Sequence, residues 1–224
     1  QRKRYWLDPK PKAASPSSSK LVGPKRPDGK GGWTFDQSLN TARIPILKEH
    51  RLGPVTILSS SMIMDFISQA AAQVMDDEVI AIRDLTFEKA VNLHPGHERA
   101  TQIQFKPRKS GGFDVLYCVQ EEGSYRPYSR ARVEASAVPG EVEALPVLQE
   151  RCATKLDVNT MVQESAAAGY SLACFAHIKE AFEGEEEILL HLQVPQSLPG
   201  ALGWALLRDV ADAIPFIGGG VHGS

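Results

Sequence analysis

The chain is poor in cysteine, has no long hydrophobic run and carries almost no net charge. Its 224 residues include three cysteines, Cys118, Cys152 and Cys174, which form neither a CxxC pair nor the spacing of a zinc site. No apolar stretch approaches the roughly 20 residues that span a membrane, and the formal net charge is -2. These absences argue against a disulfide-stapled secreted protein, a membrane protein and a nucleic-acid-binding protein.

The small number of cysteines and the sequence of the first residues predict where in the cell the protein is found. The sequence does not start with a charged segment followed by an apolar one, as a signal peptide would. We therefore expect a cytoplasmic protein whose reduced cysteines serve as small buried hydrophobic residues. With 42% hydrophobic residues, the chain can form one large domain or two small units that share a core.

Composition divides the chain into four parts. Residues 1–32 are rich in Pro, Ser, Gly and Lys. We expect a linker there, because such a segment buries too little apolar area to offset the entropy cost of ordering it. Residues 33–135 are predicted to form a first unit, residues 136–150 a connection, and residues 151–224 a second unit.

The first unit is predicted to contain one helix followed by an antiparallel meander. Ser59, Ser60 and Ser61 are N-cap candidates for an apolar helix from Met62 to about Met75. β-branched, aromatic and alternating residues then predict a series of strands joined by turns. The predicted strands lie at residues 79–87, 101–105, 113–120 and 128–137. A sheet wrapped around one buried helix is a hotdog fold.

The pattern partly recurs in the second unit. Residues 158–168 are predicted to be helical and residues 185–195 to form a strand, while the apolar residues between them fit a strand or a helix. Residues 204–213 are a second helix candidate, and few residues follow it. We therefore predict an α+β double hotdog whose second unit is shortened.

Four segments carry altered versions of known motifs in a fixed order. His50–Ser59 reads HRLGPVTILS, Gly169–Phe175 reads GYSLACF, Ala205–Ala213 reads ALLRDVADA, and IPFIGGGVHGS comes last. In this order they resemble the motifs HxxxGxxxxP, GYxYGPxF, DxxxQ or DxxxH, and LPFxW of the dehydratase domain of a modular type I polyketide synthase. The first residues, QRKRYWLDP, resemble the tail that follows an acyltransferase domain in such synthases.

The resemblance implies a reaction that removes water from a β-hydroxyacyl thioester carried on an acyl carrier protein. His50 would be the base that takes the α-proton, since imidazole suits proton transfer near neutral pH. Asp209, or Asp212 on the same predicted helix, would be the acid that protonates the departing hydroxyl. Amide groups near a helix N-terminus would stabilise the charge that develops on the thioester oxygen.

The resemblance also assigns substrate contacts to Gly53, Pro54, Ser59 and Tyr170. Pro54 stands where the family has glycine, and it has no N–H to offer the thioester oxygen. Losing one such donor costs about 100- to 1000-fold in rate, although the amide of Gly53 could replace it. Ser59 stands where the family has proline, while Tyr170 keeps the Gly-Tyr pair of its motif.

The acid of the predicted site also departs from the family pattern. Arg208 precedes Asp209, and a guanidinium beside a carboxylate favours the ionised form, which cannot donate a proton. We therefore expect a domain with little or no dehydratase activity and a structural role in its synthase. The alternative is an active dehydratase, or a double-bond isomerase or cyclase, that uses His50 with Asp209 or Asp212. A third alternative is a hotdog thioesterase or hydratase unrelated to synthases. The first residues, QRKRYWLDP, argue against it because they resemble the tail of an acyltransferase domain.

The resemblance implies partners but no cofactor. We expect an acyl carrier protein with a phosphopantetheine-bound acyl chain, neighbouring acyltransferase and other synthase domains, and a homodimer. No nucleic-acid or membrane partner is expected. His94 and His97 have a spacing that could suggest a metal, but they lie in a Pro-Gly turn without a further ligand nearby, so no metal site is predicted.

Overall fold

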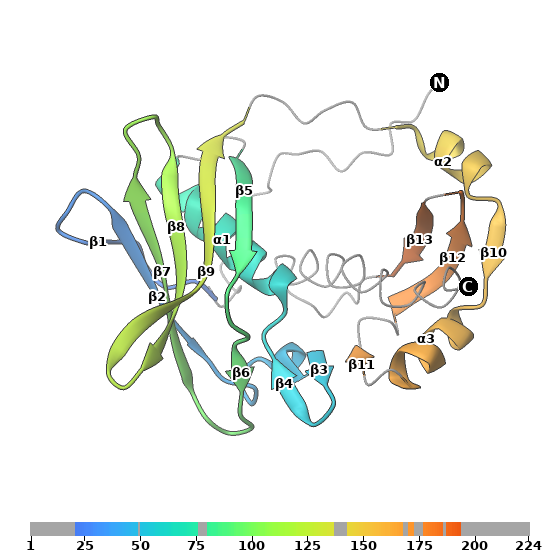
Figure 1. The fold of residues 1–224 in the computed structure, drawn as a ribbon, viewed down its shortest axis with the longest axis horizontal. Helices are drawn as coiled ribbons and strands as arrows, with labels where there is room; N and C mark the ends of the chain where they lie inside the picture. The colour runs from blue at the N-terminus through green and yellow to red at the C-terminus, as the bar shows by residue number, and fades with distance from the viewer. Residues whose placement is uncertain are drawn as a thin grey trace.

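The described residues of the computed structural model form three antiparallel sheets and a few helices (Figure 1). The structure describes residues 21–48, 50–75, 80–136, 143–167, 170–172, 177–185 and 187–193. A six-stranded sheet and a three-stranded sheet lie on opposite sides of the molecule, and a four-stranded sheet takes strands from both halves of the chain. This is the α+β, mainly antiparallel architecture that the sequence predicts.

The first unit is built on the six-stranded sheet, whose strand order is β1-β2-β7-β8-β9-β5. Every neighbouring pair is antiparallel. The bounds are β1 (Arg26–Pro27), β2 (Trp33–Leu39), β5 (Ile80–Phe87), β7 (Arg99–Pro107), β8 (Phe113–Glu121) and β9 (Ser124–Ala135). Strands β7, β8 and β9 form the predicted antiparallel meander, whereas the predicted strand β5 pairs with β9 at the edge of the sheet.

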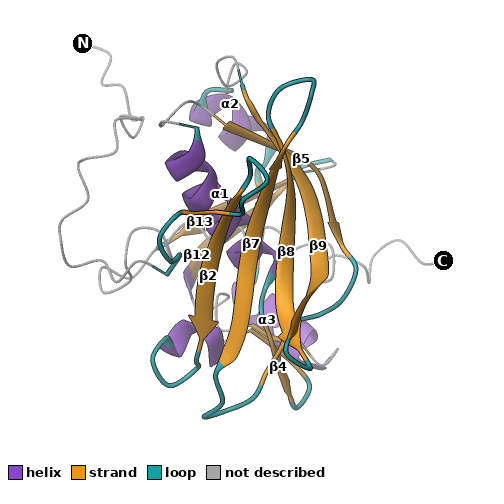
Figure 2. Ribbon diagram, turned by 90° about the vertical axis from the view of Figure 1, so that its left-hand side faces the viewer, coloured by secondary structure: helices purple, strands orange, loops and turns teal. Residues whose placement is uncertain are grey.

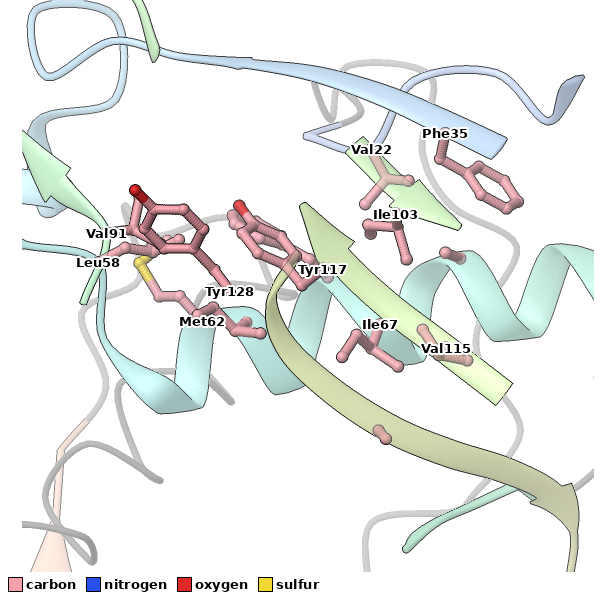
Figure 3. Packing of buried hydrophobic residues seen from close by; sticks show 14 of the residues in the cluster. Val22, Phe35, Leu58, Met62, Ile67, Val91, Ile103, Val115, Tyr117 and Tyr128 are labelled. Carbon is pink, nitrogen blue, oxygen red and sulfur yellow. The ribbon is translucent and has the colours of Figure 1, made fainter. Parts of the chain in front are cut away.

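Helix α1 (Ser60–Val74) packs along the concave side of this sheet (Figure 2). Its buried residues, which include Met62, Phe66 and Ile67, meet the inward side chains of the strands in one core. Figure 3 shows Ile67 beside Val115 of β8, and Met62 beside Tyr128 of β9. A helix that buries its apolar face against a curved sheet is the predicted hotdog arrangement.

Helix α1 begins two residues earlier than the sequence predicts, because Ser59 is its N-cap. The Ser59 backbone is extended, and its hydroxyl accepts a hydrogen bond from the amide of Met62. The same hydroxyl lies 2.9 Å from that of Ser61, and both serines are buried.

Replacing Ser59 with alanine should lower the free energy of unfolding by about 1 kcal/mol, since the cap is lost. Urea unfolding followed by circular dichroism measures this change. Ser110→Ala, in the exposed turn before β8, is the matched control and should change stability by less than about 0.5 kcal/mol. Equal stability of Ser59→Ala and Ser110→Ala would contradict the capping role.

A chain of buried polar groups crosses the core of the first unit. The Tyr117 hydroxyl donates to Thr101, whose hydroxyl lies 3.3 Å from the side-chain oxygen of Gln37. The amide of Gln37 in turn donates to the carbonyl of Leu21. Burial raises the pKa of Tyr117 well above its ordinary value, so the hydroxyl remains a donor.

Residues 21–32 belong to the first unit and not to the predicted linker. Val22 is 1% exposed within the core, and the amide of Gly23 donates to the carbonyl of Asp36. Strand β1 then pairs with β2. Composition missed this because a few apolar contacts and main-chain hydrogen bonds can order a segment that is otherwise rich in Pro, Gly and Lys. Residues 1–20 lie outside the described residues.

The turn between β8 and β9 is shorter than the sequence predicts. Glu122 and Gly123 alone form it, with φ angles of 48° and 78°. Two residues with positive φ form a type I′ turn, which matches the twist of a hairpin. Residues 124–127 therefore continue the strand instead of forming part of the turn.

The four-stranded sheet has the order β11-β3-β4-β6 and lies below α1 in Figure 1. Its strands are β3 (His50–Leu52), β4 (Val55–Ile57), β6 (Asn92–Leu93) and β11 (Tyr170–Leu172). A short 3-10 helix, η1 (Pro45–Lys48), precedes β3. The sheet joins the first half of the chain to the second.

The second unit contains a three-stranded sheet of order β10-β12-β13. The elements are α2 (Leu145–Arg151), β10 (Thr154–Leu156), α3 (Val158–Ala167), β12 (Ile178–Glu183) and β13 (Ile188–Leu192). Helix α3 and strand β13 confirm predicted elements. Helix α2 begins within the predicted connection and ends one residue beyond it, and Pro146 occupies its first turn, a position at which proline favours a helix.

Two further sequence predictions concern the second unit and the cysteines. The helix predicted at residues 204–213 lies outside the described residues, as does Cys174. Cys118 and Cys152 are buried free thiols, as expected, and burial raises the pKa of Cys118 to about 11. Within the described residues, no helix is long and apolar enough to cross a membrane.

Candidate functional site

His50 is the first residue of a two-stranded hairpin. Strand β3 pairs with β4, and Gly53 and Pro54 form the turn between Leu52 and Val55. Gly53 has a φ of 57°, which glycine adopts without strain. With the fixed negative φ of proline after it, this is the combination that a type II′ hairpin turn requires. The local sequence thus places His50 at the open end of the hairpin, away from its tip.

A strand from the second half of the chain lies directly beside His50. Strand β11 pairs antiparallel with β3, so that Leu172 is opposite His50 and Tyr170 is opposite Leu52. The segment that carries the GYSL motif therefore extends the sheet of the histidine hairpin. The tertiary structure brings together two of the motif segments that are far apart in the sequence.

His50 lines a cavity of about 310 Å³ at the N-terminus of α1. Ser60, the first residue of the helix, and Ile63, one turn later, lie in its wall. The other described lining residues are Ile57, Leu58, Phe87, Glu88, Lys89, Ala90 and Val91. The cavity thus combines a histidine and a helix N-terminus with a largely apolar wall, and we name it the His50 cavity.

One wall of the His50 cavity is residues 87–91, which we name the rim segment. The amides of Glu88 and Lys89 both donate to the carbonyl of Tyr128. The carboxylate of Glu88 forms an ion pair with Arg130 on β9. At the other end of the segment, the carbonyl of Val91 accepts from the amide of Leu58. These bonds hold the rim segment against the sheet and against the residues that precede α1.

A small charged cluster lies beside the rim segment. The Lys89 ammonium lies 5.3 Å from the centre of the Tyr128 ring and 3.9 Å from the Glu121 carboxylate. The hydroxyl of Tyr128 donates to Glu121. This hydrogen bond is the main cause that lowers the pKa of Glu121, and Lys89 adds to it. Glu121 is therefore held ionised, and its carboxylate binds both the Tyr128 hydroxyl and the Lys89 ammonium.

The predicted substrate residues have different positions in the structure. Ser59 is buried and caps α1, next to the cavity residue Ser60. Gly53 and Pro54 are exposed at the hairpin tip, and neither is among the cavity's described lining residues. The backbone of Tyr170 lies in β11. The predicted acids Asp209 and Asp212 lie outside the described residues.

His94 and His97 lie in the loop after β6. Their rings are 6.5 Å apart, centre to centre. Together with Glu98 and Arg99 they line a separate cavity of about 230 Å³. In the part of the chain that the structure describes, no group of three or more His, Cys, Asp or Glu side chains is arranged to hold a metal.

Apart from His50, sequence reasoning did not identify the residues of the cavity wall as site residues. Phe87 ends a predicted strand and Ile63 belongs to a predicted helix, so both were expected as ordinary sheet and core residues. Their shared position depends on how β5 and α1 pack against each other. No local pattern in the sequence carries that information.

Comparison with known families supports the resemblance. Residues 20–117 match the model of the polyketide synthase dehydratase domain family. The match spans the helix α1, the histidine hairpin and most of the six-stranded sheet. No curated protein shows significant sequence similarity to the chain.

Solved structures of similar fold include dehydratase domains of polyketide synthases. The domain from the CurF module of curacin polyketide synthase matches with a TM-score of 0.78 at 14% identity, covering 88% of this chain and 76% of that one. The domain from the CurJ module matches at 0.76 and 17%, covering 88% and 72%. The dehydratase domain from the terminal module of the rifamycin polyketide synthase matches at 0.76 and 15%, covering 89% and 75%. Residues 20–117 thus match the polyketide synthase dehydratase domain family in sequence, and the described residues share the hotdog fold of these solved dehydratase domains.

Proposed function

We propose that this chain binds β-hydroxyacyl thioesters on an acyl carrier protein, keeps His50 as a proton-abstracting base and has little or no net dehydratase activity. Its partners are then the carrier protein with its phosphopantetheine arm and the neighbouring domains of a polyketide synthase. The position of His50 in the wall of a cavity at the N-terminus of α1 carries this proposal.

The base side of the reaction is supported by the cavity. A histidine in its wall can take an α-proton from a bound thioester. The α-carbon becomes acidic because negative charge moves to the thioester oxygen as the proton leaves. The first amides of α1 point out of the helix N-terminus, and its dipole favours negative charge there. Ser60 places this helix end in the same wall as His50.

The structure gives less support for the acid that must protonate the departing hydroxyl. Among the described residues of the cavity wall, the carboxylate is that of Glu88, and Arg130 holds it in an ion pair. A guanidinium favours an ionised carboxylate, which does not donate a proton. Asp209 and Asp212 would have to supply the acid, and Arg208 adjoins Asp209 in the sequence. Loss of the hydroxyl as water should therefore be slower than removal of the α-proton.

A related enzyme supports the two roles. The CurK dehydratase is inactive when a histidine is replaced by phenylalanine, and also when an aspartate is replaced by asparagine. A site that keeps the histidine and has a compromised aspartate would retain one of these two functions. By this analogy, His50 corresponds to the base, and Asp209 or Asp212 to the acid.

The proposal is tested by giving the chain a β-hydroxybutanoyl carrier protein in deuterium oxide. Intact mass spectrometry should show uptake of deuterium at the α-carbon, with little loss of a water molecule. Rapid loss of water would establish an active dehydratase and overturn the weak-acid part of the proposal. Absence of both changes would overturn the catalytic part.

The last outcome would favour a structural role, which is the second candidate function. Pairing of β11 with β3 supports this candidate, because it joins the two halves of the chain whether or not chemistry takes place. A domain retained for its packing would bind its neighbours in the synthase without exchanging protons of a thioester.

The exposed position of the hairpin turn leads to a prediction for Pro54. Replacing it with glycine restores the family residue and its amide, but at a site outside the described cavity wall. We expect the α-exchange rate to change less than about two-fold. The free energy of unfolding should fall by about 0.4–1 kcal/mol, because glycine increases the entropy of the unfolded chain. A rate increase of about 100-fold would show instead that the amide reaches the thioester.

A further inference from the structure

The apolar wall of the His50 cavity suggests which part of a thioester it contacts. Five of the ten described lining residues have large apolar side chains, namely Ile57, Leu58, Ile63, Phe87 and Val91. Leu58, Ile63 and Val91 also belong to the buried core. Apolar walls stabilise apolar ligand groups by removing their surface from water. The wall therefore suits the hydrocarbon part of an acyl chain.

Phe87 differs from the buried apolar residues of the wall because nearly half of its surface is exposed to solvent. It is 46% exposed, whereas Leu58, Ile63 and Val91 are each at most 5% exposed. A single exposed hydrophobic residue is common in proteins and by itself indicates nothing. Val55 illustrates this, since it is 40% exposed on the neighbouring hairpin but is outside the described cavity wall. Phe87 combines exposure with a place in the cavity.

The backbone around Phe87 is held in place. Phe87 is in register with Ser129 in the β5–β9 pair. The next two amides donate to the carbonyl of Tyr128, and the Glu88 carboxylate is paired with Arg130. An aromatic residue on a fixed backbone loses little entropy when a ligand covers it. These contacts fix the backbone at the start of the rim segment, so that Phe87 offers a preorganised apolar surface to a ligand.

We propose that Phe87 is a specificity-determining residue that contacts the distal part of an apolar acyl chain. The inference rests on the proposed function, in that the ligand is an acyl thioester. Chains that extend along the apolar wall as far as Phe87 cover its exposed surface and bind more tightly. Short chains bind near His50 and Ser60 without reaching it.

The test measures binding of two unreactive probes, butanoyl-pantetheine and octanoyl-pantetheine, to the full chain by isothermal titration calorimetry. Both lack a β-hydroxyl group, so no dehydration can occur. Phe87→Ala should weaken octanoyl binding about 10-fold and butanoyl binding less than about two-fold, because only the longer chain loses apolar contact. Val55→Ala is the matched control and should bind both probes as the wild-type chain does.

A second variant, Phe87→Leu, keeps an apolar side chain and should bind octanoyl-pantetheine with an affinity between those of wild type and Phe87→Ala. Thermal melts establish that each variant is folded. If the wild-type chain binds both probes and the Phe87 variants lose affinity for both equally, or for neither, the role of Phe87 is wrong while the proposed function stands. If the wild-type chain binds neither probe, the proposed function fails as well.

Discussion

Replacing His50 with alanine is expected to slow deuterium exchange at the α-carbon of a carrier-bound acyl thioester by about 100- to 10,000-fold. His50 is the one histidine among the described residues of the cavity wall at the N-terminus of α1. Without the imidazole, the bases left at the described cavity wall are water and the Glu88 carboxylate, and the ion pair with Arg130 weakens that carboxylate as a base. Intact mass spectrometry over a time course in deuterium oxide measures the rate.

The matched control for this prediction is His97→Ala. His97 is exposed in the loop after β6 and is not among the described lining residues of the His50 cavity. The control should exchange as fast as the wild-type chain. If His50→Ala and His97→Ala exchange at the same rate, His50 is a structural residue and the base lies elsewhere.

Replacing Phe66 with alanine should lower the free energy of unfolding by about 3–5 kcal/mol. Phe66 is 0% exposed on α1, and its ring stacks near that of Tyr117, with 6.5 Å between the centres and 14° between the planes. The substitution removes buried surface and leaves a cavity where the helix meets the sheet. Because domains of this size are stable by only about 5–15 kcal/mol, much of the stability would be lost.

Urea unfolding measures the effect of Phe66→Ala, and Phe87→Ala is its matched control. Both changes truncate a phenylalanine, but Phe87 is 46% exposed and should cost less than about 1 kcal/mol. A small loss for Phe66→Ala would mean that α1 is not the centre of the first unit's core.

The predicted helices and strands were confirmed where a segment's own residues set its periodicity. The apolar residues of α1, the alternation in β7 and the apolar run of β13 each indicate one element without reference to the rest of the chain. Predictions were wrong where contacts distant in sequence decide. Residues 21–32 join the first unit because Leu21 accepts a hydrogen bond from Gln37 and Val22 fills a place in the core.

The candidate site shows the same division. The motif order identified His50 as the candidate base, and the structure places it in a cavity wall. The motif also suggested contacts at Gly53 and Pro54, yet the hairpin turn leaves them exposed at its tip. A motif specifies only the order of residues along the chain. The hairpin geometry determines that His50 lies at the open end and that Gly53 and Pro54 lie at the exposed tip.

By itself, the sequence determined the fold class and the helix and strands of the first unit, because these depend on residue types at short spacings that local geometry turns into one structure. The candidate base His50 came from the order of motifs that resemble those of a known family. Only the tertiary structure decided that β11 lies beside His50 and that Phe87 joins Ser60 and Ile63 in one cavity. Those positions result from packing between segments far apart in the chain, where each side chain's environment comes from its partners and not from its neighbours in sequence.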